Sequence, residues 1–432
     1  MTNFPKKILP TLAFTIAISF MNAQVVTTLA GCGGHGSTDG IGAAACFRAP
    51  YGITADGNGN LYVADANNHE IRKIVIATRE VTTLAGNTMP GSADGTGTAA
   101  SFNDPRAVAF DGGNLYVADY GNNEIRKIVI ATGVVTTLAG ITTAGSANGT
   151  GTAASFNSPN GIAADGNGNL YVGDFGNNEI RKIIITTGVV TTLAGTTTAG
   201  STDGTGATAH FNGPSGSLAD GNGNLYVCDY LNNEIRKIVI ATGSVTTLAG
   251  NTMQGSADGK GTAAYFNDPV GIATDGNGNL YVADRSNNEI RKIVISTGAV
   301  TTIEYTTTTG TATAFNTPDG VAIDQSGNLF VTVTGENEIQ EITNATGILQ
   351  NSMPNTQFNV YPNPAVDYLT VKLPSNSSKT EIKIFNIIGE LEYSSTETNQ
   401  NKNIDISNLA NGLYLIQIAT DDNMGIQKFI KQ

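Results

Sequence analysis

The stretch of sequence that decides the fold runs from Pro159 to Gly195 and reads PNGIAADGNGNLYVGDFGNNEIRKIIITTGVVTTLAG. It contains four short segments rich in Val, Ile, Thr and Tyr, which are residues that favour β-strands: GIAA, NLYV, EIRKIII and VVTTLA. The DGNGN segment between the first two is typical of a tight turn. Nearly the same text recurs along the chain. The leucine of its Leu-Ala-Gly ending falls at Leu29, Leu84, Leu138, Leu193 and Leu248, with a degraded copy at Ile303.

The copies are 54 or 55 residues apart, and a fixed period of this size indicates a repeat architecture. Four strands in each repeat are typical of the blades of a β-propeller rather than of a helical solenoid. A proline opens the first strand of each repeat and occurs six times, at Pro50, Pro105, Pro159, Pro214, Pro269 and Pro318. The sequence therefore predicts an all-β protein with a six-bladed β-propeller.

The closure of the ring follows from where the last strand type occurs. A VVTTLA-like segment precedes the first of these prolines and follows only the first five. We expect Val25–Leu29 to form the outer strand of the last blade, whose other three strands come from Pro318–Ile342. Such a pairing hides sheet edges that would otherwise be open. Ile348–Ser352 is an alternative outer strand, but it matches the repeat less well.

The repeat resembles the NHL family in the motif DGNGNLYVAD followed by NNEIRKI, seen around Asp56, Asp165, Asp220 and Asp275. The resemblance covers about residues 25–347 and implies a six-bladed propeller. It weakens in the last repeat, where TVTGENEIQEI replaces the motif. Propellers of this type include a zinc-dependent amidated-peptide lyase. The three histidines, His35, His69 and His210, occupy different repeat positions, so the sequence predicts no zinc site.

The start of the chain, residues 1–23, is typical of a secretory signal peptide. It has Lys6 and Lys7, then an apolar run from Ile8 to Phe20, then a small residue at Ala23. No other apolar run approaches the length of a membrane span, so we expect no transmembrane segment in the mature chain. Export would permit disulfides, and we expect Cys32 to pair with Cys46. Cys228 replaces a small residue of the repeat and is interpreted as a buried filler.

The end of the chain differs from the repeats. After the propeller (residues 24–350) and a polar linker (351–357), residues 358–432 alternate apolar and polar positions between turns and predict a small β-sandwich. This tail resembles the type A C-terminal sorting domain of the type IX secretion system in YPNP at Tyr361–Pro364, the IFNIIG block and LANGLY at Leu409–Tyr414. The resemblance implies that the type IX machinery is a partner, with passage through the periplasm to the outer cell surface or beyond. An adhesive immunoglobulin-like module is the alternative.

Residues that recur in every blade are interpreted as parts of the blade. One such set is an aspartate after the second strand: Asp65, Asp119, Asp174, Asp229 and Asp284. Another is an arginine in the third strand: Arg72, Arg126, Arg181, Arg236 and Arg291. The DGNGN turns place oxygens at alternate positions, as calcium sites do, but lack the bidentate glutamate. We therefore expect a turn and no cofactor, with calcium as the alternative.

Two positions vary from blade to blade and are the candidates for function. The residue after each strand-opening proline is Tyr51, Arg106, Asn160, Ser215, Val270 or Asp319. The residue after each second-strand aspartate is Ala66, Tyr120, Phe175, Tyr230 or Arg285. Both positions should lie on the loop face around the central channel. The predicted ligand-binding residues are Tyr51, Arg106, Asn160, Asp319, Tyr120, Phe175, Tyr230 and Arg285. Drift at tolerant surface loops is the alternative explanation.

The charge and the motifs limit the possible functions. The formal net charge of −13 opposes nucleic-acid binding, which depends on neutralising phosphates. No serine-hydrolase, zinc-protease or P-loop motif occurs, and we predict no catalytic residue. The sequence thus favours a secreted or cell-surface protein that binds a glycan, peptide or protein, rather than an enzyme. A lyase- or hydrolase-like enzyme acting at the central channel and a structural surface-layer or adhesin component are the alternatives.

Overall fold

The computed structural model describes residues 24–307, 315–343, 359–372, 380–386, 391–397, 401–420 and 424–432. The predicted signal peptide (1–23), the linker (351–357) and the alternative outer strand Ile348–Ser352 lie outside these residues. The chain divides into two compact units, one containing Ala23–Asn344 and the other containing Ala345–Gln432. Within the described ranges there is no helix long and apolar enough to cross a membrane.

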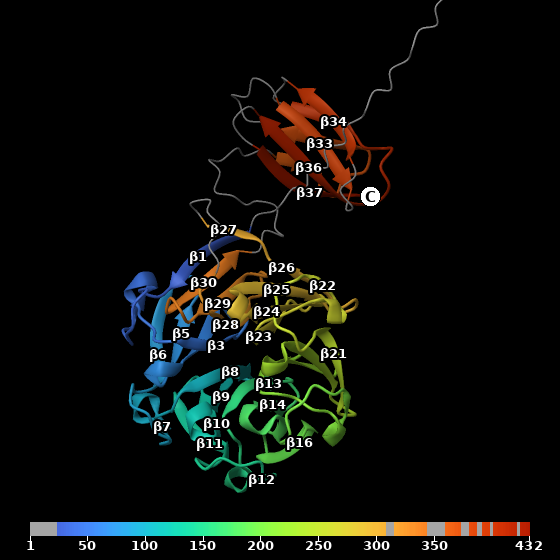
Figure 1. Ribbon diagram of the computed structural model, residues 1–432. Coiled ribbons are helices and arrows are strands. Elements are labelled where there is room, and N and C mark those ends of the chain that lie inside the picture. Colours follow the sequence, from blue (N-terminus) through green and yellow to red (C-terminus); the bar gives the residue numbers. More distant parts are fainter. Residues whose placement is uncertain are drawn as a thin grey trace, which may run out of the picture. The chain divides into compact units, whose positions relative to one another are not determined.

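The first unit is the predicted ring of six blades (Figure 1), and each blade is a sheet of five strands rather than the expected four. The repeat that opened the sequence analysis forms one of them. Its strands run outward from the centre as β13 (Pro159–Ala164), β14 (Asn169–Asp174), β15 (Glu179–Ile184) and β16 (Val189–Gly195). The fifth strand, β12 (Gly149–Thr150), lies in the loop that enters the blade and pairs with β16. This two-residue strand was not predicted.

Four other blades repeat this order. The first contains β2 (Gly40–Ile41), β3 (Pro50–Ala55), β4 (Asn60–Asp65), β5 (Glu70–Val75) and β6 (Glu80–Gly86). The second contains β7 (Gly95–Thr96), β8 (Pro105–Asp111), β9 (Asn114–Asp119), β10 (Glu124–Val129) and β11 (Val134–Gly140). The fourth contains β17 (Gly204–Thr205), β18 (Pro214–Ala219), β19 (Asn224–Asp229), β20 (Glu234–Val239) and β21 (Ser244–Gly250). The fifth contains β22 (Gly259–Lys260), β23 (Pro269–Thr274), β24 (Asn279–Asp284), β25 (Glu289–Val294) and β26 (Ala299–Thr302).

The sixth blade joins the two ends of the ring, and the predicted closure is confirmed. Its inner strands are β28 (Pro318–Ile323), β29 (Leu329–Val333) and β30 (Glu338–Thr343). The N-terminal strand β1 (Gln24–Ala30) pairs antiparallel with β30, so that Val26 lies opposite Ile342. On its other side β1 pairs in parallel with β27 (Tyr305–Thr307). The N-terminal strand and the last repeat are thus held in one sheet.

Two kinds of 3₁₀-helix complete the blades. Those in the loops between blades are η1 (Gly42–Ala44), η3 (Gly97–Ala99), η5 (Gly151–Ala153), η7 (Gly206–Thr208) and η9 (Gly261–Ala263). Those between the second and third strands are η2 (Ala66–Asn68), η4 (Tyr120–Asn122), η6 (Phe175–Asn177), η8 (Tyr230–Asn232) and η10 (Arg285–Asn287). The second kind carries one of the two variable positions.

The recurring Asp and Arg residues are structural, as predicted. Arg181 is fully buried, and its Nη1 donates to Asp174 Oδ2 at 2.8 Å and to the Ser155 carbonyl at 3.0 Å. Its guanidinium lies 5.3 Å from the centre of the buried Phe156 ring. An unpaired buried charge would be very costly, so this pairing explains why the arginine and the aspartate recur together. The arginines of four other blades make the same bond to their aspartate.

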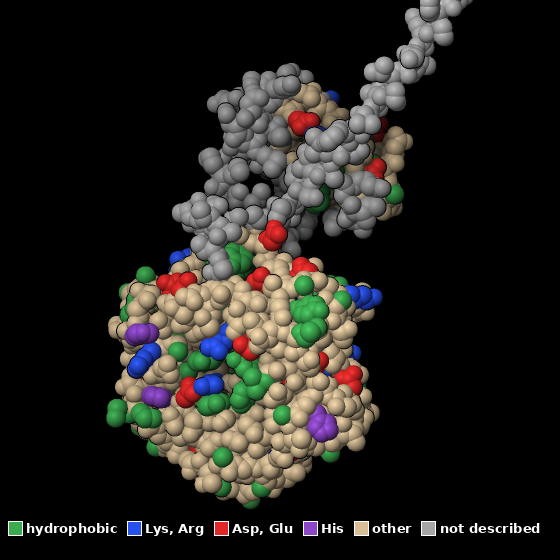
Figure 2. Space-filling model, viewed as in Figure 1, with side chains coloured by type: hydrophobic (Ala, Val, Ile, Leu, Met, Phe, Trp, Pro, Cys, Tyr) green, Lys and Arg blue, Asp and Glu red, His purple; other side chains and the backbone are tan. Residues whose placement is uncertain are grey.

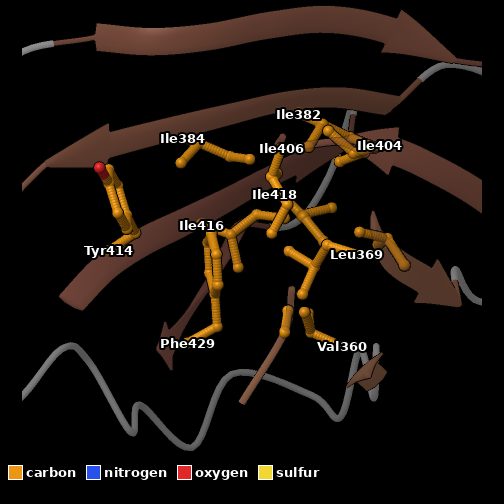
Figure 3. Close-up of a cluster of buried hydrophobic side chains, with 12 residues drawn as sticks. Val360, Leu369, Ile382, Ile384, Ile404, Ile406, Tyr414, Ile416, Ile418 and Phe429 are labelled. Carbon is orange, nitrogen blue, oxygen red and sulfur yellow. The ribbon is translucent and has the colours of Figure 1, made fainter. Parts of the chain in front are cut away.

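The second unit is a sandwich of two sheets. One sheet contains β31 (Asn359–Tyr361), β32 (Tyr368–Lys372) and β35 (Asn401–Asp405). The other contains β33 (Thr380–Asn386), β34 (Leu391–Glu397), β36 (Gly412–Thr420) and β37 (Met424–Lys431). Figure 3 shows their shared core, where Leu369 and Ile404 of the first sheet meet Ile382 and Ile418 of the second. The predicted β-sandwich is therefore present.

Candidate functional site

A bulge at the start of each innermost strand presents the first variable position. The pairing of β13 with β14 shifts register between Pro159 and Gly161, which leaves Asn160 outside the ladder. The innermost strands of the other five blades shift at the same place. A bulge of this kind re-aims the side chain of the residue that it leaves unpaired. The side chain of the residue after each strand-opening proline is therefore not bound to the in-and-out alternation of the strand.

Close packing around the axis holds these residues in a ring. The next residue along the chain is glycine in five of the blades and Ala107 in the second. A Cβ on Gly52 would lie 2.6 Å from the Arg106 carbonyl oxygen, and a Cβ on Gly161 would collide with the Ser215 carbonyl. Each glycine therefore touches the backbone of the variable residue in the next blade. The repeated glycine is required by the approach of neighbouring strands rather than by a turn.

The second variable position opens the 3₁₀-helix after a buried aspartate. The Asp174 carboxylate accepts hydrogen bonds from the backbone N–H of Asn157 at 2.7 Å and from Asn177 Nδ2 at 2.9 Å. These bonds and the ion pair with Arg181 fix the backbone from which Phe175 projects. The same arrangement fixes Tyr120, Tyr230 and Arg285, the equivalent residues of three other blades. In the first blade the equivalent residue, Ala66, is buried.

The structure brings the two positions together at one end of the channel. A cavity of about 80 Å³ is lined by Tyr51, Arg106, Asn160, Phe175, Tyr230, Val270, Arg285 and Asp319. All the predicted ligand-binding residues except Tyr120 line it. In Figure 2, basic, acidic and hydrophobic side chains gather at a hollow in the middle of the propeller face, and the surface around it is mostly tan. We call this cavity the channel mouth.

Two ion pairs organise the charges of the channel mouth. Arg285 Nε lies 3.0 Å from Asp319 Oδ1, and Arg106 Nη2 lies 2.9 Å from Asp104 Oδ2. Asp319 is 1% exposed, and its Oδ2 accepts a hydrogen bond from Thr334 Oγ1 at 2.5 Å. Burial raises the pKa of Asp319 to about 6, against the opposing effect of Arg285. The carboxylate therefore remains mainly ionised at neutral pH and keeps its pairing.

Aromatic rings surround these charges. The Arg106 guanidinium lies 3.6 Å from the centre of the Tyr120 ring and 5.1 Å from that of Tyr51. Tyr120 therefore supports the site from beside Arg106. The Phe175 and Tyr230 rings, from neighbouring blades, lie 6.0 Å apart at an angle of 55°. Burial and the Asp319 charge raise the pKa of Tyr51, which keeps its hydroxyl protonated at neutral pH.

Two other residues at the first variable position, Ser215 and Val270, were not among the predicted ligand-binding residues. Ser215 is fully buried, and its hydroxyl donates within hydrogen-bond range of the Cys228 and Pro269 carbonyls. Val270 lines the channel mouth with an apolar side chain. Beyond the mouth, the channel is a cavity of about 220 Å³ lined mainly by small and aliphatic residues of the innermost strands, such as Ile162 and Ala163. The charged side chains therefore line the mouth and not this part of the channel.

The histidines do not converge. His35 is exposed, and His69 Nδ1 accepts a hydrogen bond from the backbone N–H of Asp104 at 3.0 Å. Among the described residues there is no group of three or more His, Cys, Asp or Glu that could hold a metal ion. In the DGNGN turn, Asp56 Oδ1 accepts bonds from the N–H groups of Asn58 and Asn60. The Asp56 carboxylate is thus used to hold the backbone of its own turn.

The structure joins Cys32 and Cys46 in a disulfide, with the sulfur atoms 2.14 Å apart. It joins two cysteines 14 positions apart in the segment that follows β1. Cys228 is free and buried, as the sequence analysis predicted.

Comparison with known proteins identifies both units. The NHL repeat family matches residues 47–74, 102–128, 156–183 and 266–293, and the secretion system C-terminal sorting domain matches residues 359–432. The chain is 33% identical over 289 residues to the chloroplastic protein SUPPRESSOR OF QUENCHING 1 of Arabidopsis thaliana, covering 63% of this chain and 27% of that protein. It is 29% identical over 325 residues to human NHL repeat-containing protein 2, covering 67% of this chain and 44% of that protein.

The chain thus spans less than half the length of these two relatives. Among solved structures, a Bacteroides thetaiotaomicron protein of unknown function shares the fold with a TM-score of 0.56 and 22% identity, over 74% of this chain and 76% of that one. The family matches agree with the structure, in which the repeats form a ring of six sheets and the tail forms a separate unit. The chain is an NHL-repeat β-propeller protein that carries a secretion system C-terminal sorting domain.

Proposed function

We propose that this protein is exported through a type IX secretion system and binds an extracellular ligand at the channel mouth. The sorting domain at residues 359–432 supports the export. The observation that carries the binding role is the convergence of the variable residues. Positions that differ from blade to blade meet in one cavity, whereas the residues behind them repeat almost unchanged. A ring of rigid blades that presents different side chains at its centre is suited to recognition.

The contacts of these residues argue against drift at a tolerant surface. A drifting loop position is expected to point into solvent without specific partners. Asp319 is instead buried and paired with Arg285, from the neighbouring blade. Arg106 is held between Asp104 and two tyrosines. The cluster is therefore preorganised before a ligand arrives.

A second candidate is an enzyme acting at the same place. The observation that favours it is the pKa of about 6 for Asp319, because a carboxylate titrating near neutrality suits general acid–base catalysis. In this case Asp319 would exchange a proton with the substrate, and Arg106 and Arg285 would orient the substrate. The ligand-binding proposal needs no such step.

A thermal-shift screen of the exported protein against glycans, peptides and divalent ions tests the binding role. We expect a ligand to raise the melting temperature of the wild type and of Met253→Ala, an exposed control residue in a loop between blades. The double variant Phe175→Ala/Tyr230→Ala should lose the shift. A ligand whose shift survives in the double variant binds elsewhere and would refute the site. Turnover of that ligand, abolished by Asp319→Asn, would favour the enzyme.

A further inference from the structure

We infer that the ligand of the channel mouth is the end of a neutral saccharide chain, which places one sugar ring against Phe175 and Tyr230. This inference rests on the proposed binding function and names the chemical class of its ligand. It is argued from the balance of charge, the hydrogen-bonding groups, the aromatic surfaces and the size of the cavity.

The charges of the channel mouth cancel. Two arginines are paired with two aspartates, Arg106 with Asp104 and Arg285 with Asp319. An anionic polymer would have to compete with both carboxylates and would also approach a chain of net charge −13, which repels it. A site built for a polyanion would be expected to present unpaired cations.

A cationic ligand is disfavoured for a different reason. Its ammonium or guanidinium group would seek the faces of aromatic rings, and the protein's own arginines already occupy these places. Arg106 covers Tyr120 and Tyr51, and Arg285 lies 5.9 Å from the centre of the Tyr51 ring. The negative charge of Asp319 is likewise already matched by Arg285. The remaining possibility is a ligand without net charge.

The hydrogen-bonding groups of the cavity fit hydroxyls. The Asn160 side chain lines the cavity and makes no hydrogen bond within the described part of the chain, so its amide can both donate and accept. Asp319 lines the same wall, where its buried carboxylate is held by Arg285 and Thr334. The Arg285 side chain is 27% exposed and supplies donors beside it. Sugar hydroxyls donate and accept at once and can use such a mixed set.

The aromatic pair provides the apolar surface that a sugar ring needs. Phe175 and Tyr230 line the cavity, and neither ring has a guanidinium within cation–π distance among the described contacts. The C–H face of a pyranose packs against such rings. The cavity of about 80 Å³ is small, so the end of a chain fits better than the middle of a polymer.

Calorimetric titration of the exported protein separates the ligand classes. The probes are neutral gluco-, xylo-, manno- and galacto-oligosaccharides, an acidic oligogalacturonate, and a mixture of short peptides. We expect a neutral oligosaccharide to bind, with an affinity that changes less than about twofold between about 0.02 and 0.5 M salt. Phe175→Ala/Tyr230→Ala should weaken it by about tenfold or more. Asn160→Ala should weaken it with the melting temperature unchanged, because that side chain has no partner in the protein to lose.

The outcomes distinguish this inference from the proposed function. Binding of the oligogalacturonate or of a peptide, lost in Phe175→Ala/Tyr230→Ala, would overturn the neutral saccharide and leave the binding site in place. Binding of a neutral saccharide that is unaffected by that variant would overturn both. The absence of binding by every probe would also count against both, whereas Met253→Ala should bind as the wild type does.

Discussion

At the scale of single residues, the glycine of the repeated Pro-x-Gly sequence allows the innermost strands of neighbouring blades to approach closely. A Cβ on Gly161 would collide with the Ser215 carbonyl, and a Cβ on Gly271 would collide with the Asp319 carbonyl. The second of these carbonyls belongs to a residue of the channel mouth. The spacing of the innermost strands, and with it the position of the site residues, therefore depends on the absence of a side chain here.

This argument predicts the effect of Gly161→Ala. The added methyl group has to push β13 away from β18, and overpacking of this kind costs about 1–3 kcal/mol. We expect a loss of unfolding free energy of that size, measured by chemical denaturation. The natural control is the second blade, which carries Ala107 at this position. Ala107→Gly should change the stability by less than Gly161→Ala, and an equal effect of both changes would contradict the steric explanation.

At the scale of elements, a second set of contacts joins each blade to the next. A residue with left-handed backbone ends the 3₁₀-helix of the third blade: Asn178, with φ of 56°. Its side-chain oxygen accepts a hydrogen bond from the backbone N–H of Gly213 in the fourth blade, at 2.9 Å. His69 of the first blade likewise accepts a hydrogen bond, through Nδ1, from the backbone N–H of Asp104 in the second blade. Burial lowers the pKa of His69. The histidine that invited comparison with a zinc ligand thus replaces an asparagine of the ring.

The strand β1 is the element on which closure of the ring depends. Its residue Val26 pairs with Ile342 of β30 and with Thr307 of β27. Val26→Pro removes a main-chain donor and cannot be accommodated in the middle of a sheet. The unpaired acceptor alone should lower the unfolding free energy by about 1–3 kcal/mol, measured by denaturation with the disulfide intact.

The control for this change is Thr28→Ala in the same strand, which loses only the 2.9 Å bond from Thr28 Oγ1 to Glu338 Oε2. It should cost no more than about 1 kcal/mol. If Val26→Pro were as stable as the wild type, β1 would not be what closes the sixth blade.

At the scale of the whole molecule, repetition explains how much the sequence could predict. Each strand was visible in several copies, so the six blades and the closing strand followed from position alone. The two-residue strands such as β12 are too short to show a period, and they were missed. At the channel mouth the residues were predicted because they vary, but their partners were not. Arg285 and Asp319 lie in different blades, and their pairing depends on the curvature of the ring, which the sequence does not contain.

Repetition also places a partly buried glutamate in each of five blades, a feature that the sequence analysis missed. The glutamate that opens the third strand of each of the first five blades is close to the buried arginine but not bonded to it. For example, Glu234 Oε2 lies 3.7 Å from Arg236 Nη1 and has no hydrogen bond among the described residues. Burial raises the pKa values of Glu70, Glu124 and Glu234 to about 7 and also raises those of Glu179 and Glu289. The signal was present in the recurring EIRKI motif, whose glutamate was left unexplained.

The recurrence predicts that the propeller is more stable in mild acid than in mild base. Between about pH 4.5 and 7 the folded glutamates bind more protons than the unfolded ones, so the free energy of unfolding falls as the pH rises. His69, with its lowered pKa, acts in the opposite direction but is a single group. Chemical denaturation at several values from about pH 5 to about pH 8 should show this decline. Glu70→Gln/Glu124→Gln/Glu234→Gln should make it shallower, whereas Glu80→Gln, an exposed glutamate of β6, should not. Part of the decline should remain, because burial also raises the pKa values of Asp65, Asp119 and Asp229 to about 6. Stability that rises with pH across this range would show that the buried glutamates are ionised in the fold and held by their arginines.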